Sequence, residues 1–323
     1  MLIAYLNRET LEAEEITAEN QALLKEAVWI DLMSPTKTEE TWVEELLDIN
    51  LPTRKRMAEI ETSSRLYTEN NIIYMTAITI AQLDSTHPNL EPTTFILTQD
   101  KLITLHYVKS HSFKLFSANT KKLDAAHRSA AILLVKLLDT TIDYLADILE
   151  LVGSRLDEYS KEIFQPEQEI TAKIDYRKFM QHIGEDSDLN TKARESLISL
   201  IRLVTYLEQT VEGKLDHEGL SQLSSLIRDI NALSDHAHFL STKVNFLLDA
   251  TLGMISIEQN NIIKIFSVAA VIFLPPTLVA SIYGMNFWYI PELTWKYGYL
   301  FSIGLIALAA WLPYKYFKHR KWL

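Results

Sequence analysis

The first hundred residues alternate between hydrophobic and polar positions in short runs, as β-strands do. These runs are rich in branched and aromatic side chains, and prolines or polar pairs separate them. They occupy residues 28–32, 72–80, 93–98 and 102–106. We therefore predict an α+β domain over residues 1–125, with a mixed sheet and flanking helices.

Beyond residue 125 the apolar positions recur at spacings of four and three, which is the pattern of a coiled-coil helix. The first series is Leu138, Ile142, Leu145, Leu149, Val152, Leu156, Tyr159 and Ile163. We interpret residues 184–190 as a loop and residues 197–211 as a second helix. Residues 126–218 are thus predicted to form a long helical hairpin.

A second series with the same spacing follows the turn bracketed by Gly213 and Gly219. It consists of Leu226, Ile230, Leu233, Ala237, Leu240, Val244, Leu247, Thr251 and Met254. Gly253 alone interrupts it, and one glycine inside a helix costs only about 1 kcal/mol. We predict a single helix over residues 220–283, on the order of 95 Å long at roughly 1.5 Å per residue. Because such a helix is too long to pack within its own domain, residues 219–264 are predicted to be the stalk of a homo-oligomer.

Two uncharged runs close the chain, 21 residues at 265–285 and 17 residues at 298–314. The first is long enough to cross a bilayer as a helix, and the second is at the short end of that range. A buried helical hairpin in a soluble domain is the alternative, but uncharged runs of this length are rare in soluble cores. Tryptophans, which settle at membrane interfaces, lie near the ends of the runs. They are Trp288, Trp295, Trp311 and Trp322.

The basic residues predict the topology of the two spans, 265–286 and 298–314. Lys264 precedes the first span, and the tail 315–323 carries four Lys or Arg. The loop 287–297 has only Lys296, balanced by Glu292. The positive-inside rule then places both termini in the cytoplasm and the loop outside an inner membrane. Residues 1–15 lack a basic stretch followed by an apolar core, so we expect no cleaved signal.

The net charge of -11 conceals an asymmetry along the chain. Residues 261–323 hold six Lys or Arg and one acid, which leaves 25 basic and 41 acidic residues, a net of -16, in residues 1–260. An acidic body argues against nucleic-acid binding, and it attracts cations. The chain has no cysteine, which excludes disulfides and thiolate metal sites. We find no phosphate-binding glycine loop, nucleophile elbow or metal-hydrolase motif, so we expect neither an enzyme nor an organic cofactor.

One motif carries a specific resemblance. Tyr283-Gly284-Met285-Asn286 closes the first span, and Pro291-Glu292-Leu293 follows in the loop. Together with residues 27–32, 257–260 and 274–280, these motifs make the chain similar to the CorA family of magnesium transporters, especially its proteobacterial members. The resemblance implies a funnel-shaped homopentamer in which the first spans line a pore and the second spans form an outer ring. It also implies transport of Mg²⁺, with Co²⁺ and Ni²⁺ expected as further cargo.

In the family, a ring of motif asparagines selects the hydrated ion, and here that residue is Asn286. Mg²⁺ gives up its inner waters reluctantly, so amide oxygens that hold those waters suit it. A carboxylate ring would bind too tightly for fast release. Gly284 would let the backbones approach the axis, and Met285 would pack behind the ring. Taken without the resemblance, Gly-Asn is more simply a helix cap.

Residues at helical spacing from Gly284 define one face of the first span. They are Asn260, Ile263, Phe266, Ala270, Leu274, Thr277 and Ser281. The family lines its pore with these positions; the alternative is ordinary helix packing. The hydroxyls would serve a hydrated cation, and the apolar rings could close the path by dewetting. Pro275 and Pro276 should kink the helix.

Acidic residues suggest two further roles. Asp139, Asp143, Asp147 and Glu150 form a stripe on one helix, for which a solvated face is an equally simple explanation. Because relatives close when cytoplasmic Mg²⁺ occupies acidic sites between subunits, we take Asp229, Asp139 and Asp143 as candidate regulatory ligands. Glu292, outside the membrane, is the candidate for ion capture.

Two other functions fit the same pattern. One is a zinc transporter of the ZntB branch, although members of that branch often depart from Gly-Met-Asn. The other is a membrane-tethered sensor or scaffold, which would not need a heptad stalk continuous with a polar-lined span. Ion flux through the purified protein separates all three.

Overall fold

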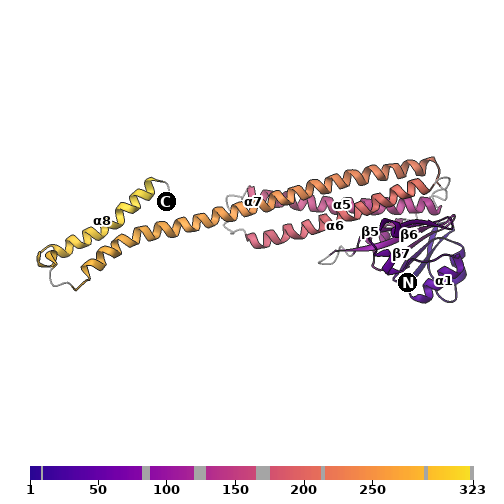
Figure 1. Cartoon of the computed structure of the whole chain (residues 1–323), viewed down its shortest axis with the longest axis horizontal. Helices are drawn as coiled ribbons and strands as arrows, with labels where there is room; N and C mark the ends of the chain where they lie inside the picture. The colour runs from indigo at the N-terminus through magenta and orange to yellow at the C-terminus, as the bar shows by residue number, and fades with distance from the viewer. Residues whose placement is uncertain are drawn as a thin grey trace. The chain divides into compact units, whose positions relative to one another are not determined.

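The computed structural model describes residues 1–8, 10–81, 88–119, 129–164, 175–211, 215–286 and 290–320. The chain divides into two compact units, Met1–Leu247 and Leu248–Leu323. Helix α7, His217–Tyr283, contributes to both units (Figure 1). Its bounds confirm the single long helix predicted from the apolar spacing.

A seven-stranded mixed sheet forms the base of unit 1, in the order β2-β1-β3-β7-β6-β5-β4. Strands β3 and β7 pair in parallel, and the other described pairs are antiparallel. The four predicted runs are confirmed as β3 (Ala27–Met33), β5 (Ile72–Ala81), β6 (Asn89–Leu97) and β7 (Leu102–His106). The alternation of apolar and polar residues did not predict β1 (Leu2–Asn7), β2 (Leu11–Glu15) or β4 (Leu66–Glu69).

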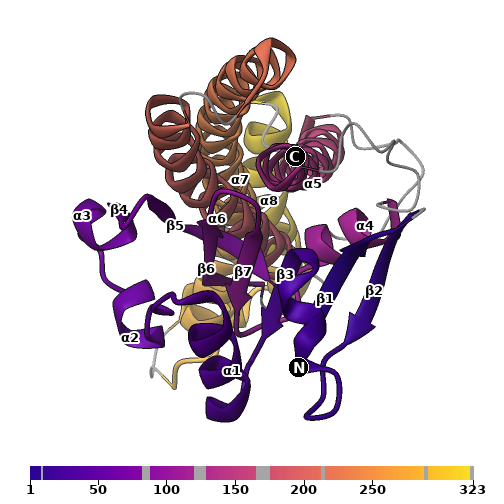
Figure 2. The same cartoon turned by 90° about the vertical axis from the view of Figure 1, so that its right-hand side faces the viewer.

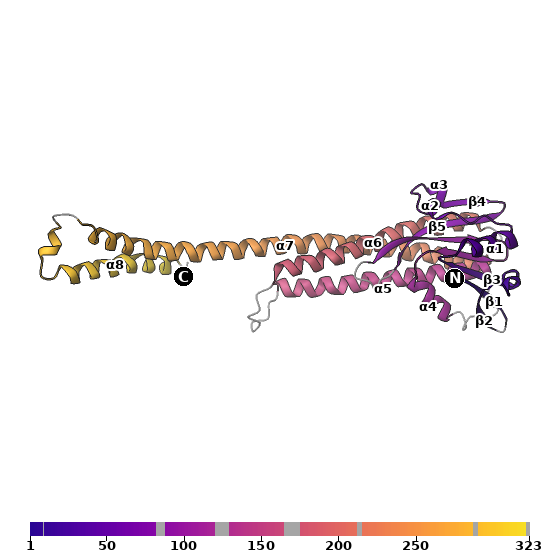
Figure 3. The same cartoon turned by 90° about the horizontal axis from the view of Figure 1, so that it is seen from below.

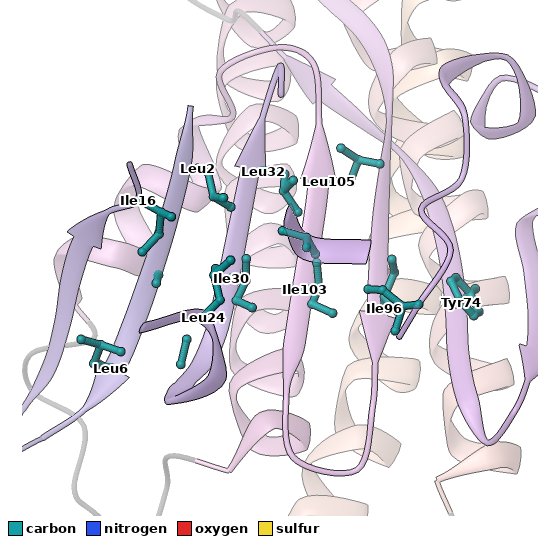
Figure 4. Close-up of a cluster of buried hydrophobic side chains, with 14 of the residues drawn as sticks. Leu2, Leu6, Ile16, Leu24, Ile30, Leu32, Tyr74, Ile96, Ile103 and Leu105 are labelled. Atoms are coloured by element: carbon teal, nitrogen blue, oxygen red, sulfur yellow. The ribbon is translucent and has the colours of Figure 1, made fainter. Parts of the chain in front are cut away.

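Helices cover both faces of this sheet (Figure 2). On one face Leu32 and Leu105 pack with Val43 of α1, Lys37–Leu47, in the core shown in Figure 4. Helix α1 begins with a capping box between Thr36 and Glu39, which satisfies its first backbone donors. Short helices η1 (Gln21–Lys25), α2 (Arg54–Met57) and α3 (Thr62–Arg65) link the strands on this side.

On the opposite face Trp29 contacts Phe113 and Phe116 of α4, His111–Asn119, at ring-centre distances of 6.5 and 5.3 Å. The long helices α5 (Ala130–Phe164) and α6 (Tyr176–Thr210) pack beside it. The predicted apolar series on α5 is confirmed, because all of its members except the half-buried Tyr159 are buried.

The loop predicted at 184–190 is wrong, because α6 continues through it. Two of its polar residues, Asp186 and Asn190, are buried and paired across helices. Asp186 accepts hydrogen bonds from Arg155 at 2.9 Å and from Tyr159 at 3.0 Å. Asn190 donates to the Ala237 carbonyl at 3.0 Å and to Ser241 at 2.9 Å. Residues that resemble a loop in sequence are here a polar layer within a helical bundle.

The expectation that the α7 series needs other copies of the chain is wrong for residues 226–247. Leu226, Ile230 and Leu240 are buried within unit 1, where α7 contacts α5 at Gly153 and α6 at Asn190. Lys243 pairs with Asp157 of α5 at 2.6 Å, and Phe246 stacks on Phe164 at 5.7 Å. Apolar residues spaced alternately four and three positions apart specify an apolar stripe on a helix, but not which helix covers that stripe.

Unit 2 holds the C-terminal part of α7, the short helix η4 (Pro291–Thr294) and α8 (Gly298–His319). Within this unit α7 and α8 lie side by side (Figures 1 and 3). Gly298 permits the tight connection, because a Cβ there would lie 2.0 Å from the Glu292 carbonyl oxygen. The predicted interface residues Trp288 and Trp322 lie outside the described residues.

Candidate functional site

The helices of unit 2 are long and apolar enough to cross a membrane. Almost none of the residues in the most apolar stretch of either helix are buried. Phe266, Phe273 and Leu300 are 71%, 70% and 67% exposed. Exposing an apolar surface of this extent to water is unfavourable, so lipid or other protein chains must cover it.

One face of α7 packs against α8. Along this face Val268 is buried and Ile272, Val279 and Tyr283 are half-buried, at helical spacing. Val279, Ile282 and Tyr283 line a small cavity of about 270 Å³ together with Leu305 of α8. Helix α7 therefore packs against the second span, α8, through a single stripe of residues.

The predicted pore-lining residues lie on the other side of α7. All seven are exposed, namely Asn260, Ile263, Phe266, Ala270, Leu274, Thr277 and Ser281. At 3.6 residues per turn this set points roughly opposite to Val268 and Val279. Helix α8 thus leaves the predicted face uncovered, and the face remains available to an aqueous path or to a second chain.

Thr277 on this face is oriented to accept hydrogen bonds. Its hydroxyl donates to the Phe273 carbonyl at 2.7 Å, so the proton is already engaged within the helix. Because Thr277 is exposed, the lone pairs of the same oxygen can accept a hydrogen bond from outside the helix. A hydrated cation turns the protons of its water outward, and these protons need acceptors of this kind.

The Gly-Met-Asn motif follows directly after α7 ends at Tyr283. The Gly284 N–H bonds to the Ala280 carbonyl at 3.0 Å and the Ser281 carbonyl at 3.2 Å, which tightens the last turn. Gly284 does not adopt a left-handed conformation, so the simple glycine-cap interpretation is not supported. A Cβ at this position would nevertheless lie 3.3 Å from the Ala280 carbonyl oxygen, a tight contact.

Met285 and Asn286 are both exposed beyond the helix end. Within the described part of the chain, no hydrogen bond involves the Asn286 amide. Phe287, the next residue of the motif, lies outside that part. The Asn286 side chain is therefore placed where a solute or another chain can reach it.

Glu292 lies in η4 and is half-buried. It lines the same small cavity as Ile282 and Tyr283, the residues that precede the motif. The predicted capture residue and the motif thus belong to one end of unit 2.

The structure brings the three candidate regulatory acids together in unit 1. Asp139 of α5 and Asp229 of α7 line one cavity of about 420 Å³. Burial and the carboxylates of Asp143 and Asp229 raise the pKa of Asp139. Burial and the carboxylates of Asp147 and Asp229 likewise raise the pKa of Asp143. Like charges on two helices therefore repel each other here.

This acidic patch is not a complete metal site on one chain. Among the residues that the structure describes, no group of three His, Cys, Asp or Glu could hold a metal ion. Gln222 and Ser225 line the same cavity and were not predicted. They lie seven and four residues before Asp229, on the same helical face, and this spacing could have identified them.

Two apolar spans attached to an α/β unit with long helices define an integral membrane protein. The profile of the family described as CorA-like Mg²⁺ transporter protein matches residues 25–319. The chain belongs to this family, as its motif predicted.

Curated relatives match over nearly their full length. The magnesium transport protein CorA of Pasteurella multocida is 35% identical over 308 residues, covering 95% of this chain and 96% of the relative. The protein of the same name from Escherichia coli K12 is 36% identical over 313 residues, covering 97% and 96%.

Solved structures share the fold. The complete CorA magnesium transporter of Methanocaldococcus jannaschii matches with a TM-score of 0.76 at 20% identity, covering 100% of this chain and 99% of that one. Full-length CmaX matches with a TM-score of 0.68 at 12% identity, covering 99% and 97%. The cytoplasmic domain of ZntB from Vibrio parahaemolyticus matches with a TM-score of 0.57 at 12% identity, covering 79% and 97%. The fold class predicted for the single chain is confirmed.

Proposed function

We propose that this chain transports Mg²⁺ across the cytoplasmic membrane as a channel-like homopentamer. The observation that carries the proposal is its identity of 35–36%, over at least 95% of the chain, to proteins named magnesium transport protein CorA. Both termini and unit 1 lie in the cytoplasm, since the basic residues flank the spans on that side.

In the proposed pore, five copies of α7 turn the face from Asn260 to Ser281 toward a common axis. The support is that this face is exposed and points away from α8. Thr277 and Ser281 accept hydrogen bonds from the water around the ion, and Leu274, Phe266 and Ile263 form rings that close by dewetting.

Selection takes place at Asn286. Its exposed amide oxygens hold the waters of a hydrated Mg²⁺ without displacing them, so the ion binds weakly enough to leave. Glu292, beside the end of α7, raises the local concentration of cations and so speeds their entry.

Cytoplasmic Mg²⁺ regulates this pore through the acidic patch. Asp139, Asp143 and Asp229 repel one another when uncompensated, and a divalent cation between them relieves that repulsion. Because the described residues of one chain supply too few ligands, a neighbouring subunit would complete the coordination.

Flux into liposomes that contain the purified chain tests the function. A trapped Mg²⁺-sensitive dye should report entry down a gradient without an energy source, with Co²⁺ and Ni²⁺ competing. Glu292→Gln should slow entry at low external Mg²⁺ and recover at high Mg²⁺. Entry of Zn²⁺ alone would instead identify a zinc transporter, and entry of no ion would identify a scaffold.

A further inference from the structure

Unit 1 contains a cavity that the transport mechanism does not use. Its volume of about 960 Å³ is that of a site for a small organic ligand. Residues from the ends of three neighbouring strands and from α4 line it. It is separate from the acidic patch, with which it shares no lining residue.

The topology of the sheet creates this cavity. Strands β3 and β7 are adjacent and parallel, so Met33 and His106 lie side by side at their carboxyl ends. The chain leaves β3 toward α1 on one face, where Val43 packs, and leaves β7 toward α4 on the other face, where Phe113 packs. A crevice forms where connections diverge in this way, and ligands of α/β proteins bind in such crevices.

The lining is basic, although the body around it is acidic. Lys109, His111 and Lys114 contribute to the wall, and Asp31 and His106 contribute to the floor. The His106 ring nitrogens lie 2.8 Å from the Val108 carbonyl oxygen and 3.0 Å from an Asp31 carboxylate oxygen. Only the imidazolium can donate to both oxygens, so the floor is an ion pair. The cationic wall is left without a matching carboxylate among the lining residues and favours an anion.

Aromatic rings and hydroxyls complete the lining. His111 stacks on Tyr144 with ring centres 5.1 Å apart, and Tyr5 and Phe113 flank the cavity. Ser34 and Ser110 add hydroxyls next to the basic residues. A flat ring can lie against such walls while phosphate oxygens meet the ammonium groups.

We propose that this cavity binds a small phosphorylated molecule that carries a planar ring, of the size and chemistry of a nucleotide. Lys109 and Lys114 bind the phosphate groups, and the aromatic wall formed by His111 and Tyr144 contacts the ring. The site is a property of unit 1, and its occupancy does not depend on which ion the spans conduct.

Equilibrium binding to the purified full-length protein tests the proposal. Binding of ATP, AMP, adenosine, tripolyphosphate and inorganic phosphate would be measured by calorimetry in EDTA, so that no Mg²⁺ shields the phosphates. The double variant Lys109→Gln/Lys114→Gln is compared with Lys37→Gln/Lys55→Gln, which removes the same charge from exposed positions of unit 1 outside the cavity.

We expect the Lys109/Lys114 variant to bind ATP at least tenfold more weakly, and the control to bind as the unchanged protein does. Adenosine and inorganic phosphate should each bind more weakly than ATP. Equal ATP affinity in all three proteins would overturn the proposal, and so would the absence of ATP binding. Tripolyphosphate binding as tightly as ATP would overturn the role of the aromatic wall.

Discussion

The Asn286 side chain carries the proposed ion selectivity, and it is exposed beyond the end of α7. Asn286→Ala removes the polar ring, so a hydrated dication loses several hydrogen bonds at once. Each such bond is worth roughly 1.5–3 kcal/mol, so transport should fall by orders of magnitude. Asn286→Asp should bind divalent ions more tightly, release them more slowly and admit Ca²⁺, which sheds water more readily.

Mg²⁺ uptake into liposomes, together with a check of assembly, measures both variants. Asn245→Ala is the matched control, because it removes an exposed amide from α7 far along the sequence from the motif. Near-normal uptake by an assembled Asn286→Ala protein would contradict the selectivity role.

The charge state of His106 should make the stability of the protein depend on pH. Burial lowers its pKa, but the hydrogen bond and charge of Asp31 and the hydrogen bond to the Val108 carbonyl together outweigh burial, so the pKa of His106 lies above its ordinary value. Its stabilising contribution is therefore fully present at a pH below the unfolded-state pKa, and is lost as pH rises through the folded-state pKa. The difference in melting temperature between the unchanged protein and His106→Gln should shrink from pH 6 to pH 9. A constant difference would show that the imidazole acts by packing alone.

At the scale of elements, the acidic patch joins α5 to α7. Changing Asp139, Asp143 and Asp229 together to Asn removes the repulsion that raises the pKa of Asp139 and Asp143. The variant should resist protease better than the unchanged protein without Mg²⁺, and should gain less protection from millimolar Mg²⁺. Asp235→Asn, an exposed acid elsewhere on α7, is the control. Equal Mg²⁺ protection in all three proteins would contradict regulation at this patch.

The sequence predicted the elements whose pattern is local. Four strands and the helix through residue 283 follow from alternation and helical spacing, which depend on near neighbours. Strand β2 was missed because only Leu11 of its five residues is buried and three are Glu. The loop error at 184–190 has a different cause, since Asp186 and Asn190 find partners only across helices.

The candidate site likewise has one part that follows from local sequence and other parts that depend on contacts between distant residues. The motif position after α7 followed from sequence, because helix length and the end of the apolar run are local features. Asp139 and Asp229 were named as candidates from sequence, but their proximity was not predicted, because they lie on two different helices and periodicity describes one helix at a time. The basic cavity was not anticipated at all, because strands distant in sequence build it.

At the scale of the whole molecule, the assembly is predicted to be a pentamer. The buried series on α7 no longer supports this, because α5 and α6 already cover it. The support is the uncovered face from Asn260 to Ser281, which includes Phe266 at 71% exposure. Native mass spectrometry in mild detergent should show mainly pentamers, and mainly monomers or dimers would contradict the prediction.

The proline pair inside α7 determines which groups must surround this part of the helix. Pro275 and Pro276 have no N–H, so the carbonyls of Val271 and Ile272, four residues earlier, lose their helical donors. In hydrocarbon each unsatisfied carbonyl costs several kcal/mol, so water or polar groups must reach them. Each chain therefore has two backbone carbonyl oxygens near the middle of its first span that need a hydrogen-bond donor from outside the helix.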